Sequence, residues 1–276
     1  MLALLIYRIL LLLLLPLLLL TLLLRSITNR QYRQRLSERL GFFPYPSPEH
    51  GKGGIVIHAA SVGEVIALTP FVEQLLSKYS HLPITITTFT PTGSAQVIKQ
   101  FSNRVQHAFL PLDVLPCTQL FLARSQPKLI IFMETELWPN LINQCANKKI
   151  KLLLINGRLS TKSMQSYQKV SALIKPSLNH FDQILCQSQD NLAHFLQLGA
   201  HTERCQMSGN LKFDISVSDS TFEKQTTLAR LLPKNRTLWL VASTHQGDEE
   251  LALNAFTTIK KHFPSVLLVL VPRHPE

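Results

Sequence analysis

Short apolar runs alternate along most of the chain with longer segments in which apolar residues recur every three or four positions. The runs are rich in Val, Ile, Leu and Phe, as expected of strands buried on both faces. They predict strands over residues 55–57, 84–89, 105–110, 128–133, 151–155 and 183–186. The segments between them predict helices up to about 76, over 91–101 and 116–125, from about 138, and over 162–175 and 190–198. This alternation with short loops predicts an α/β fold with a parallel sheet covered by helices on both faces.

The alternation lapses near residues 215–228, in the polar stretch SVSDSTFEKQTT, which we interpret as a linker. A second series follows, with a strand over 237–242, a helix over 249–262 and a strand over 266–271. One and a half βαβ repeats are too few to enclose a hydrophobic core of their own. We therefore expect a complete Rossmann-like domain over 54–214, part of a second one over 229–276, and a chain truncated at its C-terminus.

A leucine-rich run, Ile9 to Leu24, predicts that residues 1–24 attach the chain to a membrane. A helix needs about 20 apolar residues to cross the hydrocarbon core, and Arg8 interrupts the apolar residues before this run. The segment is therefore either a short span or a helix that lies in the membrane interface. A cleaved signal peptide is disfavoured, because no small-residue cleavage site follows the run.

The formal net charge of +11 and the arginines after the leucine run extend this interpretation. Residues 25–53 form a basic connector whose cations favour the cytoplasmic side of a membrane and attract anionic lipid. Nucleic-acid binding is disfavoured, because the sequence contains no recognisable RNA or DNA module. The four cysteines lie far apart without a CxxC pair, so we expect reduced thiols, and no residue spacing predicts a metal site.

The motif HAASVGEV follows the strand over 55–57 and precedes a helix, which places Glu64 where a parallel strand passes into a helix. Ligands bind at this edge of open α/β sheets. The peptide dipoles stabilise a carboxylate in the first turn of a helix, and Gly63, two residues after Ser61, leaves room for another molecule. Glu64 is therefore a candidate reactive base, and the alternative is an ordinary capping carboxylate.

Polar residues recur where the other predicted strands end, which indicates a cleft along one edge of the sheet. They include Thr92, Gly93, Ser94, Glu134, Glu136, Arg158, Lys212, Ser243, Thr244, Arg273 and His274. Gly93 and Ser94 begin a helix and either present amides to an anion or simply cap that helix. The two glutamates either face the cleft or brace an arginine, and each cation taken alone is typical of a solvated surface.

The candidate cleft holds carboxylates and several cations, and the sequence shows neither a nucleophile triad nor a metal-ligand spacing. This combination favours transfer of a sugar from a nucleotide donor. An acceptor hydroxyl loses its proton as it attacks, and one carboxylate suffices to accept it. The leaving phosphate needs cations and helix-start amides to stabilise its charge, rather than a second, protonated carboxyl group.

Eight motifs resemble the family of bacterial 3-deoxy-D-manno-octulosonic acid (Kdo) transferases of lipid A synthesis, and they run in the family's order from about Arg33 to Glu276. They are HAASVGEV, TTFTPTGSAQV, LPLD, METELWPNLI, INGRLS, GNLKFD, STHQGDEE and LVPRHPE. The resemblance implies two Rossmann-like domains of the GT-B type and a membrane-attached N-terminus. It also implies inverting transfer of Kdo from CMP-Kdo to the lipid A precursor, lipid IVA, at the cytoplasmic face of the inner membrane, without a metal or other cofactor.

The resemblance also assigns roles to residues. Glu64 matches the general base, Glu136 or Glu134 matches an acidic residue needed for transfer, and Lys212 matches a lysine that steadies charge in the transition state. The motif at the end of the chain, with Ser243 and Thr244, implies binding of the CMP moiety through Pro272, Arg273 and His274. The remaining candidates are expected on the acceptor side, with the arginines facing lipid phosphates: Ser61, Gly63, Thr92, Gly93, Ser94, Arg158, Arg33 and Arg35.

Members of the family are longer at the C-terminus than this sequence, so we expect this chain to bind the donor CMP-Kdo weakly. Two alternatives stay open: a GT-B transferase that uses another nucleotide sugar, and an inactive, truncated, membrane-bound scaffold. The number of Kdo units transferred and the oligomeric state do not follow from the sequence.

Overall fold

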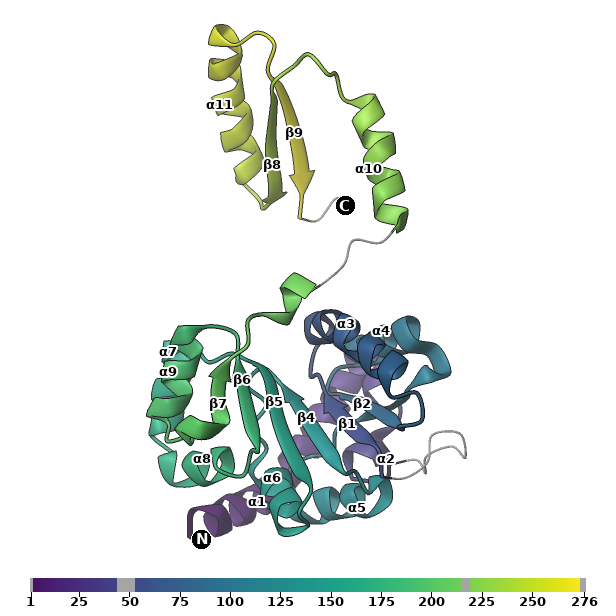
Figure 1. Cartoon of the computed structure of the whole chain (residues 1–276), viewed down its shortest axis with the longest axis vertical. Coiled ribbons are helices and arrows are strands. Elements are labelled where there is room, and N and C mark those ends of the chain that lie inside the picture. Colours follow the sequence, from purple (N-terminus) through teal and green to yellow (C-terminus); the bar gives the residue numbers. More distant parts are fainter. Residues whose placement is uncertain (1, 44–52, 215–218, 274–276) are drawn as a thin grey trace. The chain divides into compact units, whose positions relative to one another are not determined.

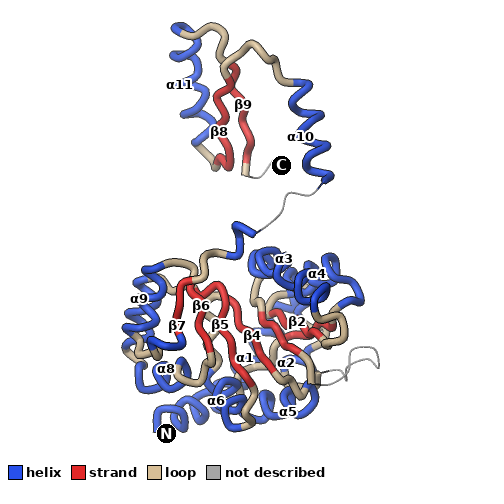
Figure 2. The backbone as a smooth tube through the Cα atoms, in the orientation of Figure 1, coloured by secondary structure: helices blue, strands red, loops and turns tan. Residues whose placement is uncertain are grey.

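The computed structural model describes residues 2–43, 53–214 and 219–273, which fall into two compact units (Figure 1). Unit 1 comprises residues 1–215 and unit 2 comprises residues 216–276. Unit 1 contains one seven-stranded sheet and unit 2 contains a two-stranded sheet among the described residues (Figure 2). Both sheets are parallel, so the predicted α/β class is confirmed.

The strand order of unit 1 places the first strand in the middle of the sheet. The order is β3-β2-β1-β4-β5-β6-β7. The strands are β1 (Ile55–His58), β2 (Ile84–Thr88), β3 (Gln106–Phe109), β4 (Leu129–Met133), β5 (Lys151–Gly157), β6 (Gln183–Cys186) and β7 (Cys205–Met207). The chain thus builds the sheet outward from β1 in one direction and then, from β4, in the other, as in Rossmann-like folds.

Helices cover both faces of this sheet, because the strand side chains are apolar on both sides. One face carries α3 (Val62–Lys78) and α4 (Pro91–Phe101), which share a buried core with Ile57, Ile86 and Ile131. The other face carries α5 (Leu115–Ser125), α6 (Pro139–Asn147), α7 (Thr161–Gln168), α8 (Ser171–Leu178) and α9 (Gln189–Gln197). Phe132 and Phe181 lie in the core beneath this second layer, with ring centroids 5.9 Å apart.

The predicted elements differ from the structure in three places in the two units. The helix expected over 162–175 is two helices, α7 and α8, because the chain turns at Lys169 and Val170 although the apolar spacing continues. Strand β7 is too short and too exposed for a periodic pattern to predict it. In the stretch interpreted as a linker, α10 (Asp219–Leu231) is a polar helix without a buried face, rich in the helix formers Glu, Lys, Gln and Leu.

Unit 2 consists of α10, two parallel strands and one further helix. Strand β8 (Leu238–Thr244) pairs with β9 (Leu267–Pro272), and α11 (Asp248–His262) connects them. Acidic residues occupy the first turn of α11 and basic residues its last turn, as the helix dipole favours.

The segment before the first strand is helical over most of its described length. Helix α1 (Leu2–Thr28) is longer than the predicted run and, by length and composition, is long enough to cross a membrane over Leu2–Ile27. A 3-10 helix, η1 (Arg30–Tyr32), and a short helix, α2 (Leu36–Arg39), follow. Helix α2 packs beside β3, so the basic connector is part of unit 1 in the described residues.

Candidate functional site

The strongest candidate site lies where the growth of the sheet changes direction, between β1 and β4. Glu64 follows β1, and Glu134 and Glu136 follow β4. These strands pair directly, with His58 opposite Phe132, so their carboxyl ends are neighbours. Ligands bind at such switch points in open α/β sheets, which makes the three carboxylates candidates for chemistry at a bound ligand.

Glu64 is held at the start of α3 by a reciprocal cap. Ser61 is the N-cap residue, and its Oγ accepts a 3.4 Å hydrogen bond from the Glu64 amide. The Glu64 carboxylate turns back and accepts hydrogen bonds from the Ala60 amide at 2.9 Å and from Ser61 Oγ at 2.8 Å. This capping box positions the carboxylate in the strand-to-helix turn. The capping alternative from the sequence is therefore present, and it fixes the position of the carboxylate.

The protonation of Glu64 is shifted by its surroundings. The residue is 9% exposed, and burial is the main cause that raises its pKa above the ordinary value. The charges of Glu136 and Glu134 raise this pKa further, while the hydrogen bonds from Ser61 and Ala60 oppose the shift. A carboxylate with a raised pKa is a stronger base than an exposed glutamate. Beside it, Gly63 is exposed, and a side chain there would meet only Ser61 Oγ at 4.0 Å.

Glu136 is fixed by two side chains that the sequence analysis did not select. The indole Nε1 of Trp138 donates a 2.9 Å hydrogen bond to Glu136 Oε2, and Nε2 of His58 lies 3.4 Å from the same oxygen. Burial raises the pKa of Glu136, but the contacts with His58 and Trp138 outweigh burial, and the net shift is downward. Glu136 is therefore held as an anion near Glu64. The neighbouring Glu134 has a left-handed backbone with φ of 54°.

An aromatic stack continues from this carboxylate toward the segment before β1. Trp138 stacks on Phe89, with ring centroids 5.8 Å apart and planes inclined by 27°. The buried guanidinium of Arg39 lies over Phe89 at 5.1 Å and donates to its carbonyl oxygen at 2.8 Å. His58 and Trp138 lie within two of the motifs quoted above, HAASVGEV and METELWPNLI, and this position in the motifs is the signal that could have identified them.

The start of α4 is capped by a side chain and closely packed, as the contacts of Thr90 and Gly93 show. Thr90 caps the helix by accepting from the Gly93 amide at 3.1 Å, and a side chain at Gly93 would lie 3.0 Å from Thr90 Oγ1 and 3.3 Å from Thr88 Cβ. Close packing therefore explains why residue 93 is a glycine. Thr92 is exposed, and Ser94 is 7% exposed with its hydroxyl 3.4 Å from Nδ1 of His107.

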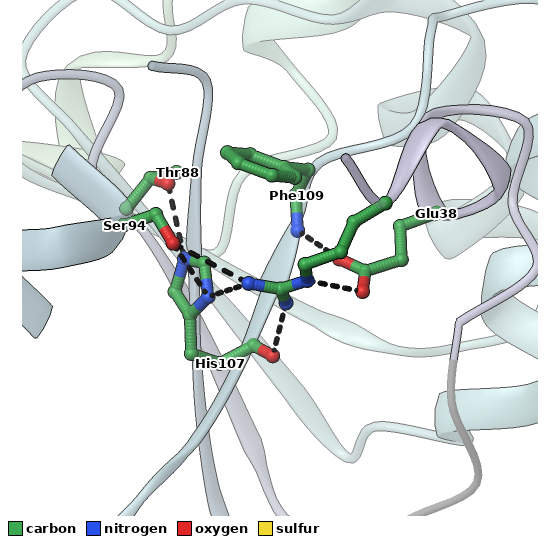
Figure 3. A network of polar contacts seen from close by, with 6 residues as sticks. Glu38, Thr88, Ser94, His107 and Phe109 are labelled. Atoms are coloured by element: carbon green, nitrogen blue, oxygen red, sulfur yellow. Dashed lines mark hydrogen bonds and ion pairs between the residues drawn. The ribbon is translucent and has the colours of Figure 1, made fainter. Parts of the chain in front are cut away.

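Arg35 joins this helix start to the outer strand β3 through Ser94 and His107, two of the residues labelled in Figure 3. Its guanidinium donates to Glu38 Oε1 at 2.5 Å, to Ser94 Oγ at 3.3 Å and to the His107 carbonyl at 2.8 Å. Glu38 Oε2 accepts from the Phe109 amide at 2.8 Å. Most donors of Arg35 are therefore used within unit 1.

A cavity of about 220 Å³ opens beside Arg35, and it is lined partly by Gln31, Gln34 and Ile98. Arg33, which was expected on the acceptor side with Arg35, is exposed. The cavity is thus lined by amide side chains, by the guanidinium of Arg35 and by an apolar wall.

The remaining candidates of unit 1 follow β5 and β7. Arg158 is exposed, and its carbonyl oxygen accepts from Thr135 Oγ1. Lys212 is exposed in the 3-10 helix η4 (Leu211–Asp214), which packs beside α3 at the same edge as Glu64. Asn156 Oδ1 holds this turn by accepting from the Leu211 amide at 3.1 Å, and a cavity of about 390 Å³ lies under it.

In unit 2 the predicted nucleotide-binding residues gather at the carboxyl ends of its two strands. Ser243 has a left-handed backbone with φ of 61°, and Thr244 is buried and donates to Glu249. The Arg273 amide donates to the Thr244 carbonyl at 3.0 Å, which fixes the chain directly after Pro272. His274 lies outside the described residues. The expectation that no metal or cofactor takes part stays a prediction.

Solved structures with the same fold include enzymes of nucleotide-sugar chemistry. The chain is similar to a crystal structure of UDP-GlcNAc 2-epimerase from Neisseria meningitidis, with a TM-score of 0.55 and 17% identity over 81% of this chain and 66% of that one. A putative UDP-N-acetylglucosamine 2-epimerase from Listeria monocytogenes gives a TM-score of 0.52 and 14% identity over 80% and 62%. The class defined by the fold is thus a GT-B-like α/β protein.

Sequence relatives define the class more narrowly. The family model of 3-deoxy-D-manno-octulosonic-acid transferase (Kdo transferase) matches residues 34–215. A 3-deoxy-D-manno-octulosonic acid transferase from Haemophilus influenzae is 43% identical over 98% of this chain and 63% of its own length. One from Rickettsia felis is 35% identical over 80% of this chain and 47% of its own length. The chain belongs to the Kdo transferase family, and it spans less than two thirds of the length of these relatives.

Proposed function

We propose that this protein transfers Kdo from CMP-Kdo to lipid IVA, the lipid A precursor, with inversion at the anomeric carbon. The observation that carries the proposal is the Glu64 carboxylate, held at the switch point by Ser61 and Ala60 in a chain of the Kdo transferase family. Two further features support the proposal: the anionic carboxylate of Glu136, and the cations at the neighbouring strand ends.

In this mechanism Glu64 accepts the proton of the acceptor hydroxyl as its oxygen attacks the anomeric carbon of Kdo. The new glycosidic bond forms while the bond from that carbon to the CMP phosphate breaks, and CMP leaves with the bonding electrons. The raised pKa of Glu64 supports this role, since a base works best when its pKa lies close to the operating pH. Attack opposite to the leaving phosphate inverts the anomeric centre.

Glu136 and the cations stabilise charge in this proposal. Glu136 is favoured over Glu134 as the second functional carboxylate, because Trp138 and His58 fix its position. Lys212, exposed at the same edge as Glu64, steadies the charge that develops in the transition state. Arg273 and the residues at the ends of β8 and β9 bind the CMP moiety, with His274 next to them in the sequence.

The acceptor side of the proposal rests on the residues around the start of α4. The cavity beside Arg35 receives a phosphate of the lipid. Arg33, Thr92 and Arg158, all exposed, contact other parts of the acceptor in this proposal. The apolar helix α1 keeps the protein at the inner membrane, with unit 1 on the cytoplasmic face where the basic connector favours it.

The test measures the formation of Kdo-lipid from CMP-Kdo and lipid IVA by the unchanged chain, by Glu64→Gln and by Glu134→Gln. Gln replaces the carboxylate with a group of the same size that is not a base, so we expect Glu64→Gln to lose about a thousandfold or more of its turnover. Glu134→Gln is the matched control. Near-normal turnover in Glu64→Gln contradicts the assignment of the base.

The same assay separates the alternatives. If the chain binds or uses UDP-sugars and not CMP-Kdo, it is a transferase with another donor, a possibility that the fold shared with UDP-GlcNAc 2-epimerases raises. If it transfers nothing but still binds membranes, it is an inactive scaffold.

A further inference from the structure

Helix α1 is fastened to unit 1 by three hydrogen bonds near its start. Tyr7 Oη donates to Asp113 Oδ2 at 2.9 Å, while Arg8 donates from Nε to Asn140 Oδ1 at 2.9 Å and from Nη2 to Asn143 Oδ1 at 3.0 Å. Asp113 is 5% exposed and Asn140 is fully buried, so these partners belong to the interior of the domain. The arginine that interrupts the apolar run in the sequence is therefore a docking residue.

An apolar stripe continues the docked face along the helix. Together with Tyr7 and Arg8, its members lie on one side of the helix and are buried or half-buried. They are leucines except for the buried polar residue at the end: Leu4, Leu11, Leu15, Leu18, Leu19, Leu22 and Ser26. Leu11, Leu15 and Leu19 pack against a cluster formed by Leu112, Val114 and Cys117. At 1.5 Å per residue the stripe extends over about 33 Å, and Figure 1 shows α1 passing α8 and α6 along this path.

The opposite face of α1 is apolar and has no protein partner among the described residues. The exposed apolar side chains of the helix are Leu2, Leu5, Ile6, Ile9, Leu10, Leu12, Leu13, Leu14, Leu17, Leu20, Leu23, Leu24 and Ile27. A contiguous apolar surface of this size on a soluble protein marks an interaction site. Two exposed cations, Arg30 and Arg33, follow directly after the helix.

We propose that α1 lies flat in a single leaflet of the membrane, with its docked face on unit 1 and its outward face among acyl chains. A helix that crosses the bilayer is surrounded by lipid or by other membrane segments over about 30 Å, and unit 1 covers one side of α1 over that distance. Crossing would require α1 to detach, which would expose the docked stripe and carry Arg8 into hydrocarbon. Arg30 and Arg33 then meet anionic headgroups at the end of the helix.

This inference rests on the membrane association proposed above but not on Kdo transfer, so the two are tested separately. It states that the N-terminus and unit 1 lie on the same side of the membrane. It also states that the two faces of α1 have different roles, one structural and one lipid-binding, although both are made of leucine.

A matched pair of substitutions tests the two faces. Leu13 is 71% exposed on the outward face, and Leu15 is on the docked face. Leu13→Arg is expected to lower co-sedimentation with phosphatidylethanolamine–phosphatidylglycerol vesicles by about tenfold or more without changing the unfolding temperature. Leu15→Arg is expected to lower the unfolding temperature. Equal losses of vesicle binding with unchanged unfolding temperatures in both variants would overturn the proposal.

The position of the N-terminus provides a second measurement. A single cysteine is placed ahead of Met1 on a short Gly-Ser extension, outside the lipid-facing helix, in a Cys205→Ser background, because the other three thiols are buried. The protein is added to preformed vesicles of the same composition and treated with a membrane-impermeant maleimide. Labelling of the added cysteine supports the flat helix, and protection of this thiol in vesicles but not in detergent contradicts it. Self-association of the chain that prevents vesicle binding would make a second copy the occupant of the outward face and would also overturn the proposal.

Discussion

Nε2 of His58 lies 3.4 Å from Oε2 of Glu136, with the imidazole completely buried and the carboxylate 24% exposed. The other ring nitrogen, Nδ1, lies 3.0 Å from Thr87 Oγ1 and 3.1 Å from the Thr87 carbonyl oxygen. A histidine on β1 thus links the neighbouring strand β2 to the carboxylate that follows β4. The His58 imidazole contacts Glu136 from β1, while the indole of Trp138, two residues after Glu136, donates a hydrogen bond to the same carboxylate oxygen.

The first prediction concerns Trp138→Phe, which keeps an aromatic ring on Phe89 and removes only the indole donor. We expect the pKa of Glu136 to rise, because one of the contacts that lowers it is lost. A carboxylate with a depressed pKa stabilises the fold above its unfolded-state pKa, and this stabilisation is lost as the pH falls through its folded-state pKa. The variant should therefore lose about 1–2 kcal/mol at neutral pH and show a weaker loss of stability on acidification.

Chemical unfolding of Trp138→Phe and of the unchanged chain at a series of pH values tests this expectation. Phe89→Leu is the control, since it removes the stacking partner but leaves the indole hydrogen bond in place. If both variants show the same pH dependence as the unchanged chain, the hydrogen bond does not hold Glu136 as an anion.

The second prediction concerns the stability of Glu64→Gln, apart from its activity. Because the pKa of Glu64 is raised, the folded chain binds the proton more tightly than the unfolded chain, and stability falls as the pH rises through this region. Gln removes that charge and keeps groups that pair with the Ala60 amide and Ser61 Oγ. We expect unchanged or higher stability at neutral pH, whereas Ser61→Ala should cost about 1 kcal/mol through loss of the cap.

Thermal unfolding of the two variants at neutral pH distinguishes these effects. A large loss of stability in Glu64→Gln would mean that the negative charge itself holds the turn, and that Glu64 is primarily a structural carboxylate.

The third prediction concerns Asp113, whose pKa burial raises to about 6 despite hydrogen bonds from the Asn140 and Leu141 amides and Tyr7. Its unfolded-state pKa is near the ordinary 3.8. The folded chain therefore holds the proton between about pH 4 and pH 6, and stability should fall by about 2–3 kcal/mol as the pH rises through this window. Asp113→Asn cannot ionise and should remove this slope.

The slope, and not the absolute stability, is the quantity to compare, because the amide of Asn cannot accept from both backbone groups as the carboxylate does. Denaturant unfolding between pH 4 and pH 7 measures it. An unchanged slope in Asp113→Asn would show that another group titrates there.

The fourth prediction compares two glycines with the same backbone angle. Gly41 and Gly209 both have φ of +88°. A side chain at Gly41 would lie 2.1 Å from the Cys117 carbonyl oxygen, whereas one at Gly209 would meet nothing within 4 Å. Gly209→Ala should cost about 1–2 kcal/mol for the left-handed backbone alone, and Gly41→Ala should cost clearly more. Equal losses in thermal unfolding would show that the approach of Gly41 to α5 is not rigid.

The fold was largely predictable because buried parallel strands produce apolar runs that are hard to mistake. The strands that lead into Glu64 and Glu134 are of this kind, and the loop after each strand then places a motif at the switch point. Strand β7 and helix α10 were not predicted, because β7 is only three residues long and α10 has no buried face.

Within the site, the sequence indicated which residues lie at one edge but not which contacts hold them. Ser61 was selected as an acceptor-binding residue, and the structure places its hydroxyl on Glu64. Arg35 was selected to face lipid phosphate, and most of its donors pair with Glu38, Ser94 and His107. The contacts of Arg35 with Ser94 and His107 join residues far apart in the chain, so no local pattern records them. The pairs Ser61–Glu64 and Arg35–Glu38 are three residues apart, and a local pattern can indicate them, as the capping alternative did for Glu64.

The contacts of Arg35 and Glu38 with β3 set a limit on how the protein can be shortened. Strand β3 is an outer strand of the sheet, and these two side chains occupy the His107 carbonyl and the Phe109 amide on it. A water-soluble version made by deleting the leucine helix together with the arginines behind it would uncover those groups, and an uncovered strand recruits strands from other molecules. A soluble form that stays monodisperse therefore has to retain the chain from Arg35 onward.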